Sequence, residues 1–454
     1  MLRVFRLESR FPSARNGFPI IPAACQSPAG NTGILVEVFN SWVILPKTSN
    51  ARIRVLDQAR RQMLGDKEMA ALADDMRAWR RDIHRHPELG FAEHRTAMVV
   101  AGLLREWDIS VQTDFAGTGV VGTIRGTLPA DGRQALAIGL RADMDALPMM
   151  EQGSVPYKSV TDGVFHGCGH DGHTAILLGV AKHLSMNRRF HGTVHLIFQP
   201  AEETLRGGSE MIRAGLFEHY PCDEIYALHN SNAVPSGKVG VRAGAILSAS
   251  DLFRIRIEGT GSHAAMPHKA VDPILVGTSL VQSIQSIVSR NVDPTEAAVV
   301  SVCRFLAGTA INVIPDSAVL EGTVRTFSCA TQALVLERLN TLCDGASRSF
   351  GCCVVFEHLQ TSPPTVNAPF QTDVVRRAAE SVLGRDNVIV NVAPLMASED
   401  FAFMLEQCPG SYFFLGHDGL TCHHPEFDFD DSSLPLGASV FIEVIKQRLG
   451  ETGA

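Results

Sequence analysis

Short apolar segments alternate with helical ones over residues 66–244, and this alternation constrains the fold more than any other feature of the sequence. Ala135–Leu140 and Val194–Phe198 have the composition of buried strands, whereas Thr174–Leu184 and Gly208–Ala214 have helical spacing. Strands and helices that alternate in this way predict an α/β domain, in which helices cover both faces of a sheet. Polar motifs follow the strands, where domains of this class bind their ligands.

The pattern changes near Arg242 and returns to the first type after a turn-rich segment. In between, strands and helices follow the order β-α-β-β-α-β, at Asp251–Glu258, Val271–Ser289, Ala298–Phe305, Ala318–Phe327, Gln332–Phe350 and Cys352–His358. This is the order of a ferredoxin-like α+β plait. The sequence therefore predicts an α/β domain in two pieces, residues 66–244 and 360–450, with the plait, residues 245–359, inserted between them. A length of 454 residues agrees with two domains.

The first 64 residues differ from the rest in charge and in pattern. They contain nine Lys and Arg against three Asp and Glu, a balance of +6, while the remaining residues have 31 against 45, a balance of −14. They also contain five prolines and no sustained helical period. We interpret residues 1–65 as a leader that is disordered or precedes the true start of the protein. The alternative is a targeting segment, because the first 25 residues are rich in Arg and poor in acidic residues.

Composition argues against several classes of protein. The net charge of −8 disfavours binding of nucleic acid through a basic surface. No run of 18 apolar residues occurs, so we expect no membrane-spanning helix. The ten Cys are scattered along the chain, which is typical of free thiols in a reducing compartment rather than of a disulfide scaffold. We expect a cytoplasmic protein, and the leader leaves an organellar or exported location open.

Residue types that bind metals are concentrated between His166 and His173. The sequence His-Gly-Cys-Gly-His-Asp-Gly-His places three His, one Cys and one Asp within eight residues, separated by Gly. Glycine lets the backbone turn tightly and approach a ligand closely. Thiolate and imidazole together favour a transition metal such as Zn, Mn, Co or Ni over Mg or Ca. The alternative for this segment alone is a His-rich surface loop.

Two adjacent carboxylates, Glu202 and Glu203, follow the predicted strand Val194–Phe198 in the sequence Gln-Pro-Ala-Glu-Glu. Such a pair cannot be buried without partners, and in most proteins it is a solvated turn. Beside a metal ion the two groups can divide the work. One binds the ion, and the other accepts a proton from water that the ion activates.

Further candidate ligands stand near the ends of other predicted strands. His229 follows one apolar run, and His423 lies in the sequence Cys-His-His-Pro. An isolated His in such a position is usually structural, but the two clusters above make both residues candidate ligands. Asp143 and Asp145 follow the strand at Ala135–Leu140, and they could act as ligands, as supports of ligands or as structural caps.

Five motifs in this order resemble the metallo-amidohydrolase branch of the aminoacylase/carboxypeptidase peptidase clan. Hippurate hydrolases, N-acyl-amino-acid amidohydrolases and auxin-conjugate hydrolases belong to this branch. The motifs are Arg-Ala-Asp-Met-Asp-Ala-Leu-Pro from Arg141, His-Gly-Cys-Gly-His-Asp-Gly-His from His166, Gln-Pro-Ala-Glu-Glu from Gln199, Leu-His-Asn from Leu228 and His-His-Pro-Glu-Phe-Asp-Phe from His423. The resemblance extends from about Met69 to the C-terminal helix and leaves the leader out.

The resemblance implies a centre of two divalent transition-metal ions, which could be Mn, Zn, Co or Ni. The implied metal ligands are Cys168, His170, Glu203, His229 and His423. Glu202 matches the general base of the family. In the His-x-Pro motif the first His is the ligand, so the role of His424 stays open.

The resemblance also assigns roles within the plait, which matches the lid and dimerisation domain of the family. His263 matches a residue that reaches the substrate carbonyl, in this clan often from a partner subunit. Asn312 and Arg325 match positions that contact the substrate. The implied assembly is a homodimer formed through the lid domain.

The function implied by these residues is hydrolysis of the amide bond of N-acyl amino acids, hippurate or related conjugates. Metal-activated water would attack with Glu202 as general base, releasing a free amino acid and a carboxylic acid. One alternative is a dipeptidase or aminopeptidase with the same centre. Another is a non-catalytic binding protein on this scaffold, which would not need the carboxylate of Glu202.

Overall fold

The computed structural model describes residues 33–38, 41–46, 66–129 and 134–451, and the chain divides into two compact units, Met1–Asp57 and Gln58–Ala454. In the first unit, strands β1 (Gly33–Val38) and β2 (Ser41–Pro46) pair antiparallel. The rest of the predicted leader lies outside the described residues, so our interpretation of residues 1–65 stays a prediction.

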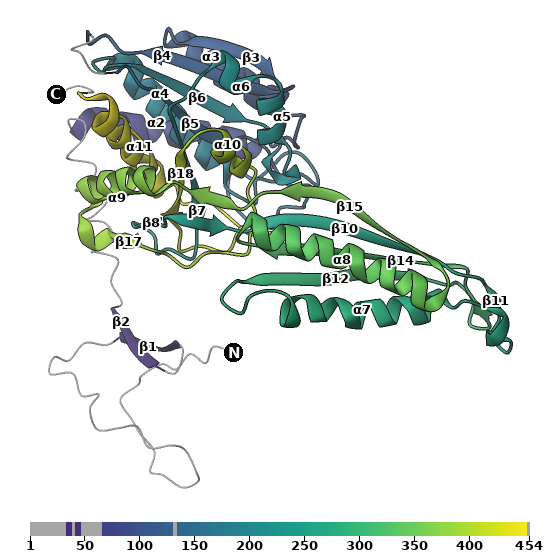
Figure 1. Ribbon diagram of the computed structural model, residues 1–454. Coiled ribbons are helices and arrows are strands. Elements are labelled where there is room, and N and C mark those ends of the chain that lie inside the picture. Colours follow the sequence, from purple (N-terminus) through teal and green to yellow (C-terminus); the bar gives the residue numbers. More distant parts are fainter. Residues whose placement is uncertain (1–32, 39–40, 47–65, 130–133, 452–454) are drawn as a thin grey trace, which may run out of the picture. The chain divides into compact units, whose positions relative to one another are not determined.

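An eight-stranded mixed sheet organises the α/β part of the second unit, in the order β17-β8-β18-β7-β5-β6-β4-β3 (Figure 1). Its strands are β3 (Ser110–Phe115), β4 (Gly119–Arg125), β5 (Ala137–Asp143), β6 (Thr193–Gln199), β7 (Glu224–Ser231), β8 (Val239–Val241), β17 (Val388–Val390) and β18 (Gly410–Gly416). The central neighbours β18, β7, β5 and β6 are parallel to one another. They are almost wholly buried, which explains why they read as continuous apolar runs.

Helices cover both faces of this sheet, as the alternating pattern predicts (Figure 1). They are α2 (Asp66–Arg85), α3 (His94–Glu106), α4 (His170–Met186), α5 (Gly207–Arg213), α6 (Leu216–His219), α9 (Pro369–Leu383), α10 (Phe401–Gln407) and α11 (Leu434–Leu449). On one face, Ile225 of β7 joins a core with Met211 of α5 and Met404 of α10. On the other face, Leu228 of the same strand lies close to Ile176 of α4 and Gly437 of α11. Side chains of β7 that point in opposite directions therefore pack against different helices.

The predicted ferredoxin-like plait is present as a four-stranded antiparallel sheet in the order β12-β14-β10-β15. Its elements along the chain are β10 (Ala249–Glu258), α7 (Pro273–Arg290), β12 (Ala298–Ala307), β14 (Ser317–Thr326), α8 (Cys329–Phe350) and β15 (Cys353–Ser362). Ile255, Leu280, Leu320 and Leu339 belong to a core of its own. The predicted fold class, an α/β domain with an inserted α+β plait, is thus confirmed.

Two small sheets accompany the plait. Strands β9 (Gly244–Leu247) and β16 (Thr365–Asn367) pair where the chain enters and leaves it, and β11 (Ser262–His263) pairs with β13 (Val313–Ile314) at one of its ends (Figure 1). Short 3-10 helices lie at Glu202–Thr204, Pro267–Lys269, Arg385–Asn387 and Asp431–Ser433. Within the described part of the chain, no helix has the length and apolar character needed to cross a membrane.

One helix begins earlier than its spacing predicts. We expected it from Thr174, but α4 begins at His170, so the second half of the His-Gly-Cys-Gly-His-Asp-Gly-His sequence forms its first turn. The apolar period alone missed this turn, because its buried side chains are His170, Asp171 and His173 rather than apolar residues.

Candidate metal centre

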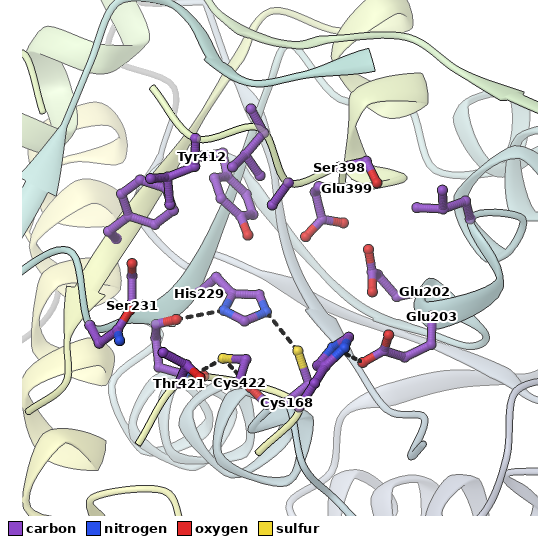
Figure 2. A pocket seen from close by; sticks show the side chains of 18 residues that line it. Cys168, Glu202, Glu203, His229, Ser231, Ser398, Glu399, Tyr412, Thr421 and Cys422 are labelled. Atoms are coloured by element: carbon purple, nitrogen blue, oxygen red, sulfur yellow. Dashed lines mark hydrogen bonds and ion pairs between the residues drawn. The ribbon is translucent and has the colours of Figure 1, made fainter. Parts of the chain in front are cut away.

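The candidate site lies where four neighbouring parallel strands end. Asp143 is the last residue of β5, and Glu202 and Glu203 follow β6 in the 3-10 helix. His229 lies near the end of β7, and His423 lies in the loop after β18. Carboxyl ends of parallel strands meet at one edge of the sheet, which brings these distant segments together. A cavity of about 460 Å³ is lined there by Cys168, Glu202, Glu203, His229 and His423 among others (Figure 2).

Glycine allows the cysteine segment to pass close to β7. Gly169, between Cys168 and α4, has φ of +99°, and a Cβ at this position would lie 2.3 Å from Oδ1 of Asn230. Any other residue at this position would have a strained backbone, and its Cβ would clash with the side chain of Asn230. The glycine that separates Cys168 from His170 is therefore required for both side chains to reach the same site.

The structure brings all five implied ligands together. Sγ of Cys168 lies 3.4 Å from Nε2 of His229, and Nε2 of His423 lies 3.3 Å from Oε1 of Glu203. Two sets of ligand atoms each fall within 4.8 Å, one from Cys168, His170 and His229 and the other from Cys168, Glu203 and His423. Cys168 belongs to both sets, so its sulfur lies where it could contact two ions.

The orientation of two imidazoles suits metal binding. Nδ1 of His170 lies 2.9 Å from the carbonyl oxygen of Asp145, and Nδ1 of His229 lies 2.7 Å from that of Asn230. A carbonyl oxygen only accepts, so each Nδ1 carries the hydrogen and leaves Nε2 with a free lone pair. Nε2 of His170 is buried and has no hydrogen-bond partner in the described ranges. A buried nitrogen with a free lone pair can bind a metal ion, so the residues present fit a metal centre.

Other polar residues nearby support the ligands rather than face the cavity. His173 uses both ring nitrogens, at 2.6 Å from Oδ1 of Asp143 and 2.8 Å from Oδ1 of Asn230. Oδ2 of Asp145 accepts from the backbone N–H of Glu203 at 3.0 Å, and its Oδ1 lies 3.2 Å from Nδ1 of His170. These contacts suit Asp143 and Asp145 as supports of the ligands, one of the three roles that the sequence left open. Asp143 also has an oxygen within 4.8 Å of the ring nitrogens of His170 and His173. His424 does not line the cavity.

Glu202 is 6% exposed and lines the cavity beside Glu203. Its carboxylate lies within 4.8 Å of those of Glu399 and Asp400. Burial raises the pKa of Glu202 above its usual value, and the charges of Glu399 and Glu203 raise it further. A raised pKa makes this carboxylate a better proton acceptor than an ordinary glutamate, as a general base requires.

Arg141 holds this group of carboxylates together. The side chain is fully buried on β5, and it donates to Gln199 at 2.9 Å and to Asp143 at 2.7 Å. It also donates to Glu399 at 2.9 Å and to Asp400 at 3.1 Å. These bonds join the ends of β5 and β6 to the loop before α10.

Replacing Arg141 by Met is expected to lower the free energy of unfolding by ~3–5 kcal/mol, because it leaves buried carboxylates without their cation. Denaturant-induced unfolding of the purified variant measures the change. The matched control is Arg105→Met on the exposed side of α3, which should change stability by less than about 0.5 kcal/mol. An Arg141→Met protein as stable as the wild type would contradict this role.

Two residues of the cavity wall, Glu399 and Tyr412, were missed in the sequence, as was the buried Asp400 beside them. The two acids precede α10 and therefore resemble an ordinary helix start. Tyr412 lies within the apolar run of β18 and resembles a core residue. The only local signal was an adjacent pair of acids next to an apolar helix, which does not distinguish a site from a cap.

The structure does not bring the predicted plait residues into the cavity. His263 on β11 and Asn312 before β13 lie side by side, since His263 pairs with Val313, and both are exposed. Arg325 lies on β14, half-buried, and donates to the carbonyl of Val324 at 3.1 Å. None of the three lines the cavity that contains Cys168.

Comparison with known proteins agrees with the fold and with the motifs. Residues 139–447 match the model of peptidase family M20/M25/M40. The chain is 39% identical over 383 residues to a hippurate hydrolase of Campylobacter jejuni, covering 84% of this chain and 98% of that protein. It is 38% identical to an N-acetyl-L-cysteine deacetylase of Bacillus subtilis, over 82% of this chain and 87% of that protein.

A solved structure is similar as well. The crystal structure of a dinuclear metal-binding peptidase of family M20 from Bacillus subtilis superposes with a TM-score of 0.73 at 33% identity. The match covers 84% of this chain and 99% of that one. The resemblance found in the five motifs is confirmed, and the chain belongs to peptidase family M20/M25/M40.

Proposed function

We propose that the protein is a metal-dependent amidohydrolase that cleaves N-acyl amino acids into a free amino acid and a carboxylic acid. The observation that carries this proposal is the geometry around Cys168, where two sets of ligand atoms share one thiol beside the buried Glu202. The names of the two relatives described above, a hippurate hydrolase and an N-acetyl-L-cysteine deacetylase, refer to substrates of this class.

The proposed centre holds two divalent transition-metal ions. Cys168, His170, Glu203, His229 and His423 would hold them, and Cys168 is common to both sets of ligand atoms. Mixed thiolate, imidazole and carboxylate ligands suit Zn, Mn, Co or Ni. When bound, such ions lower the pKa of water and polarise a carbonyl group.

The protein's own residues supply the remaining steps. Glu202 accepts the proton of the attacking water and returns it to the nitrogen of the departing amine. Arg325 binds the carboxylate of the amino-acid part through its planar fork, and Asn312 is a second substrate contact. His263 donates to the carbonyl oxygen as negative charge develops on it.

Delivery of His263 from a second chain would account for its absence from the cavity of its own chain. We propose a homodimer formed through the plait, which acts as lid and dimerisation domain. β12 lies at the edge of its sheet and exposes Phe305 and Leu306, and Ile311 and Val313 are exposed beside His263. An edge strand with exposed apolar side chains can pair across a two-fold axis.

Replacing Cys168 by Ser is expected to remove most bound metal and most activity together, because the thiolate common to both sets of ligand atoms is lost. Elemental analysis of the purified protein and rates after addition of Mn, Zn, Co or Ni measure both effects. The matched control is Cys353→Ser, an exposed cysteine of β15, which should leave both unchanged. Full metal content in Cys168→Ser would contradict the role of Cys168 as a ligand. A wild type without metal that no added ion activates would contradict the metal centre.

A substrate screen tests the function itself. Metal-loaded protein is incubated with hippurate, N-acetyl amino acids, indole-acetyl amino acids and dipeptides, and released amino acid is measured. Hydrolysis of the acylated compounds supports the proposal, whereas hydrolysis of dipeptides alone would establish the dipeptidase alternative. No hydrolysis with tight binding would indicate a binding protein.

We propose acylated substrates rather than those with a free amine, because the carboxylates of the cavity wall already have partners or roles. A free ammonium group needs a carboxylate with acceptor capacity to spare. Oε1 of Glu399 already accepts from Arg141 at 2.9 Å and from the backbone N–H of Phe401 at 3.0 Å, and its Oε2 lies 3.5 Å from Arg141. Glu202 is reserved for proton transfer in the proposed mechanism.

A further inference from the structure

The cavity contains a tyrosine hydroxyl that has no hydrogen-bond partner among the residues that the structure describes. Tyr412 lies on β18, is 2% exposed and lines the cavity together with Glu202 and His229. Its hydroxyl forms no hydrogen bond with any residue in the described ranges. Figure 2 shows this hydroxyl pointing into the cavity, towards the space between His229 and Glu399. The hydroxyl faces the cavity and is not used by a described residue, so a molecule that enters the cavity can accept its hydrogen bond.

Three neighbouring rings hold the ring that carries this hydroxyl. It packs against the rings of Phe401 at 6.2 Å, Phe414 at 5.9 Å and His229 at 6.4 Å between centroids. The backbone of Tyr412 is fixed as well, because the side-chain amide of Asn367 donates to its carbonyl and accepts from its N–H, both at 2.7 Å. The hydroxyl therefore keeps one position, as a preorganised donor requires.

The residues around the Tyr412 hydroxyl indicate which group of the substrate accepts its hydrogen bond. A phenol is protonated near neutral pH and can donate one hydrogen bond. The carboxylates of Glu202 and Glu399 line the same cavity and repel a substrate carboxylate. A neutral carbonyl oxygen meets no such repulsion, and it gains negative charge only as water attacks.

We propose that Tyr412 is a further catalytic residue, whose hydroxyl donates a hydrogen bond to the oxygen of the scissile carbonyl. The bond strengthens as the carbonyl carbon becomes tetrahedral, so it lowers the barrier more than it tightens substrate binding. This inference rests on the proposed amide hydrolysis.

Tyr412→Phe removes the hydroxyl and keeps the ring. We expect kcat on the best N-acyl amino acid to fall by ~10²-fold, with KM changed little, as for loss of one oxyanion donor. Metal content should equal that of the wild type. The matched control is Tyr226→Phe on β7, a second buried tyrosine, whose hydroxyl donates to Glu224 at 2.8 Å and does not line the cavity. Its kcat should remain that of the wild type.

Binding of two inhibitors gives a readout that does not depend on turnover. Calorimetry measures the affinity of a phosphinate that mimics the tetrahedral intermediate and of the planar carboxylic acid product. Tyr412→Phe should weaken phosphinate binding by at least ~10-fold and leave product binding unchanged.

Several results would overturn the inference. One is a kcat of Tyr412→Phe equal to that of the wild type, whether or not KM rises. Another is an equal loss of affinity for the phosphinate and for the carboxylic acid product. These results leave the proposed function intact if the wild type hydrolyses N-acyl amino acids. A metal-loaded wild type that hydrolyses none of them would overturn the proposed function, and the inference with it.

Discussion

Replacing Glu202 by Gln is expected to lower kcat by at least ~100-fold while metal content stays near that of the wild type. Glutamine keeps the size of the side chain but cannot accept the proton of the attacking water. Glu202 is buried beside Glu203, and its pKa is raised by burial and by the charge of Glu399, so its loss removes a base suited to this step. Steady-state kinetics and elemental analysis of the same preparation measure the two quantities.

Two further glutamates provide the comparison. Glu203→Gln should lose metal as well as activity, because Glu203 is a proposed ligand. Glu106→Gln, on the exposed side of α3, makes the same chemical change on the surface and should change neither. Near-normal turnover in Glu202→Gln would remove this residue from the role of general base.

Replacing His263 by Ala is expected to lower kcat by ~10²–10³-fold with the metals retained, as for loss of an oxyanion donor. His263 is exposed on β11 and does not line the cavity of its own chain. Its effect on catalysis therefore depends on assembly, and the active enzyme is expected to be a homodimer in light scattering. His94→Ala, an exposed histidine of α3, is the matched control and should keep full activity.

Mixing two inactive chains tests delivery from the partner. A dimer of one Glu202→Gln chain and one His263→Ala chain contains one complete site if His263 crosses between subunits. Random exchange then restores about a quarter of the wild-type activity, since half of the dimers are mixed and each has one intact site. No recovery despite proven exchange would mean that His263 acts within its own chain, and a monomeric active enzyme would refute delivery from a partner.

The sequence by itself identified the candidate site residues that lie in short, recognisable motifs. Cys168 and His170 are recognisable because metal-binding types are packed between glycines within eight residues. Glu202 and Glu203 are recognisable because two carboxylates directly follow an apolar strand. The alternation of strands and helices also predicted the α/β domain and the inserted plait, since these depend on patterns within single segments. The ends of α4 were less predictable, because its first turn buries polar side chains.

Only the tertiary structure decided which residues from distant segments share the cavity. Arg141 contacts Glu399 across 258 residues of sequence, and Gln199 contacts Asp400 across 201, so no spacing rule could have joined them. In the sequence Tyr412 resembles a core residue, and its ring does pack in the core. Only the position of its hydroxyl, which faces the cavity, marks it as a candidate site residue. The distinction between His170, with a free Nε2, and His173, with both nitrogens bonded, likewise depends on neighbours that the chain brings together only when it folds.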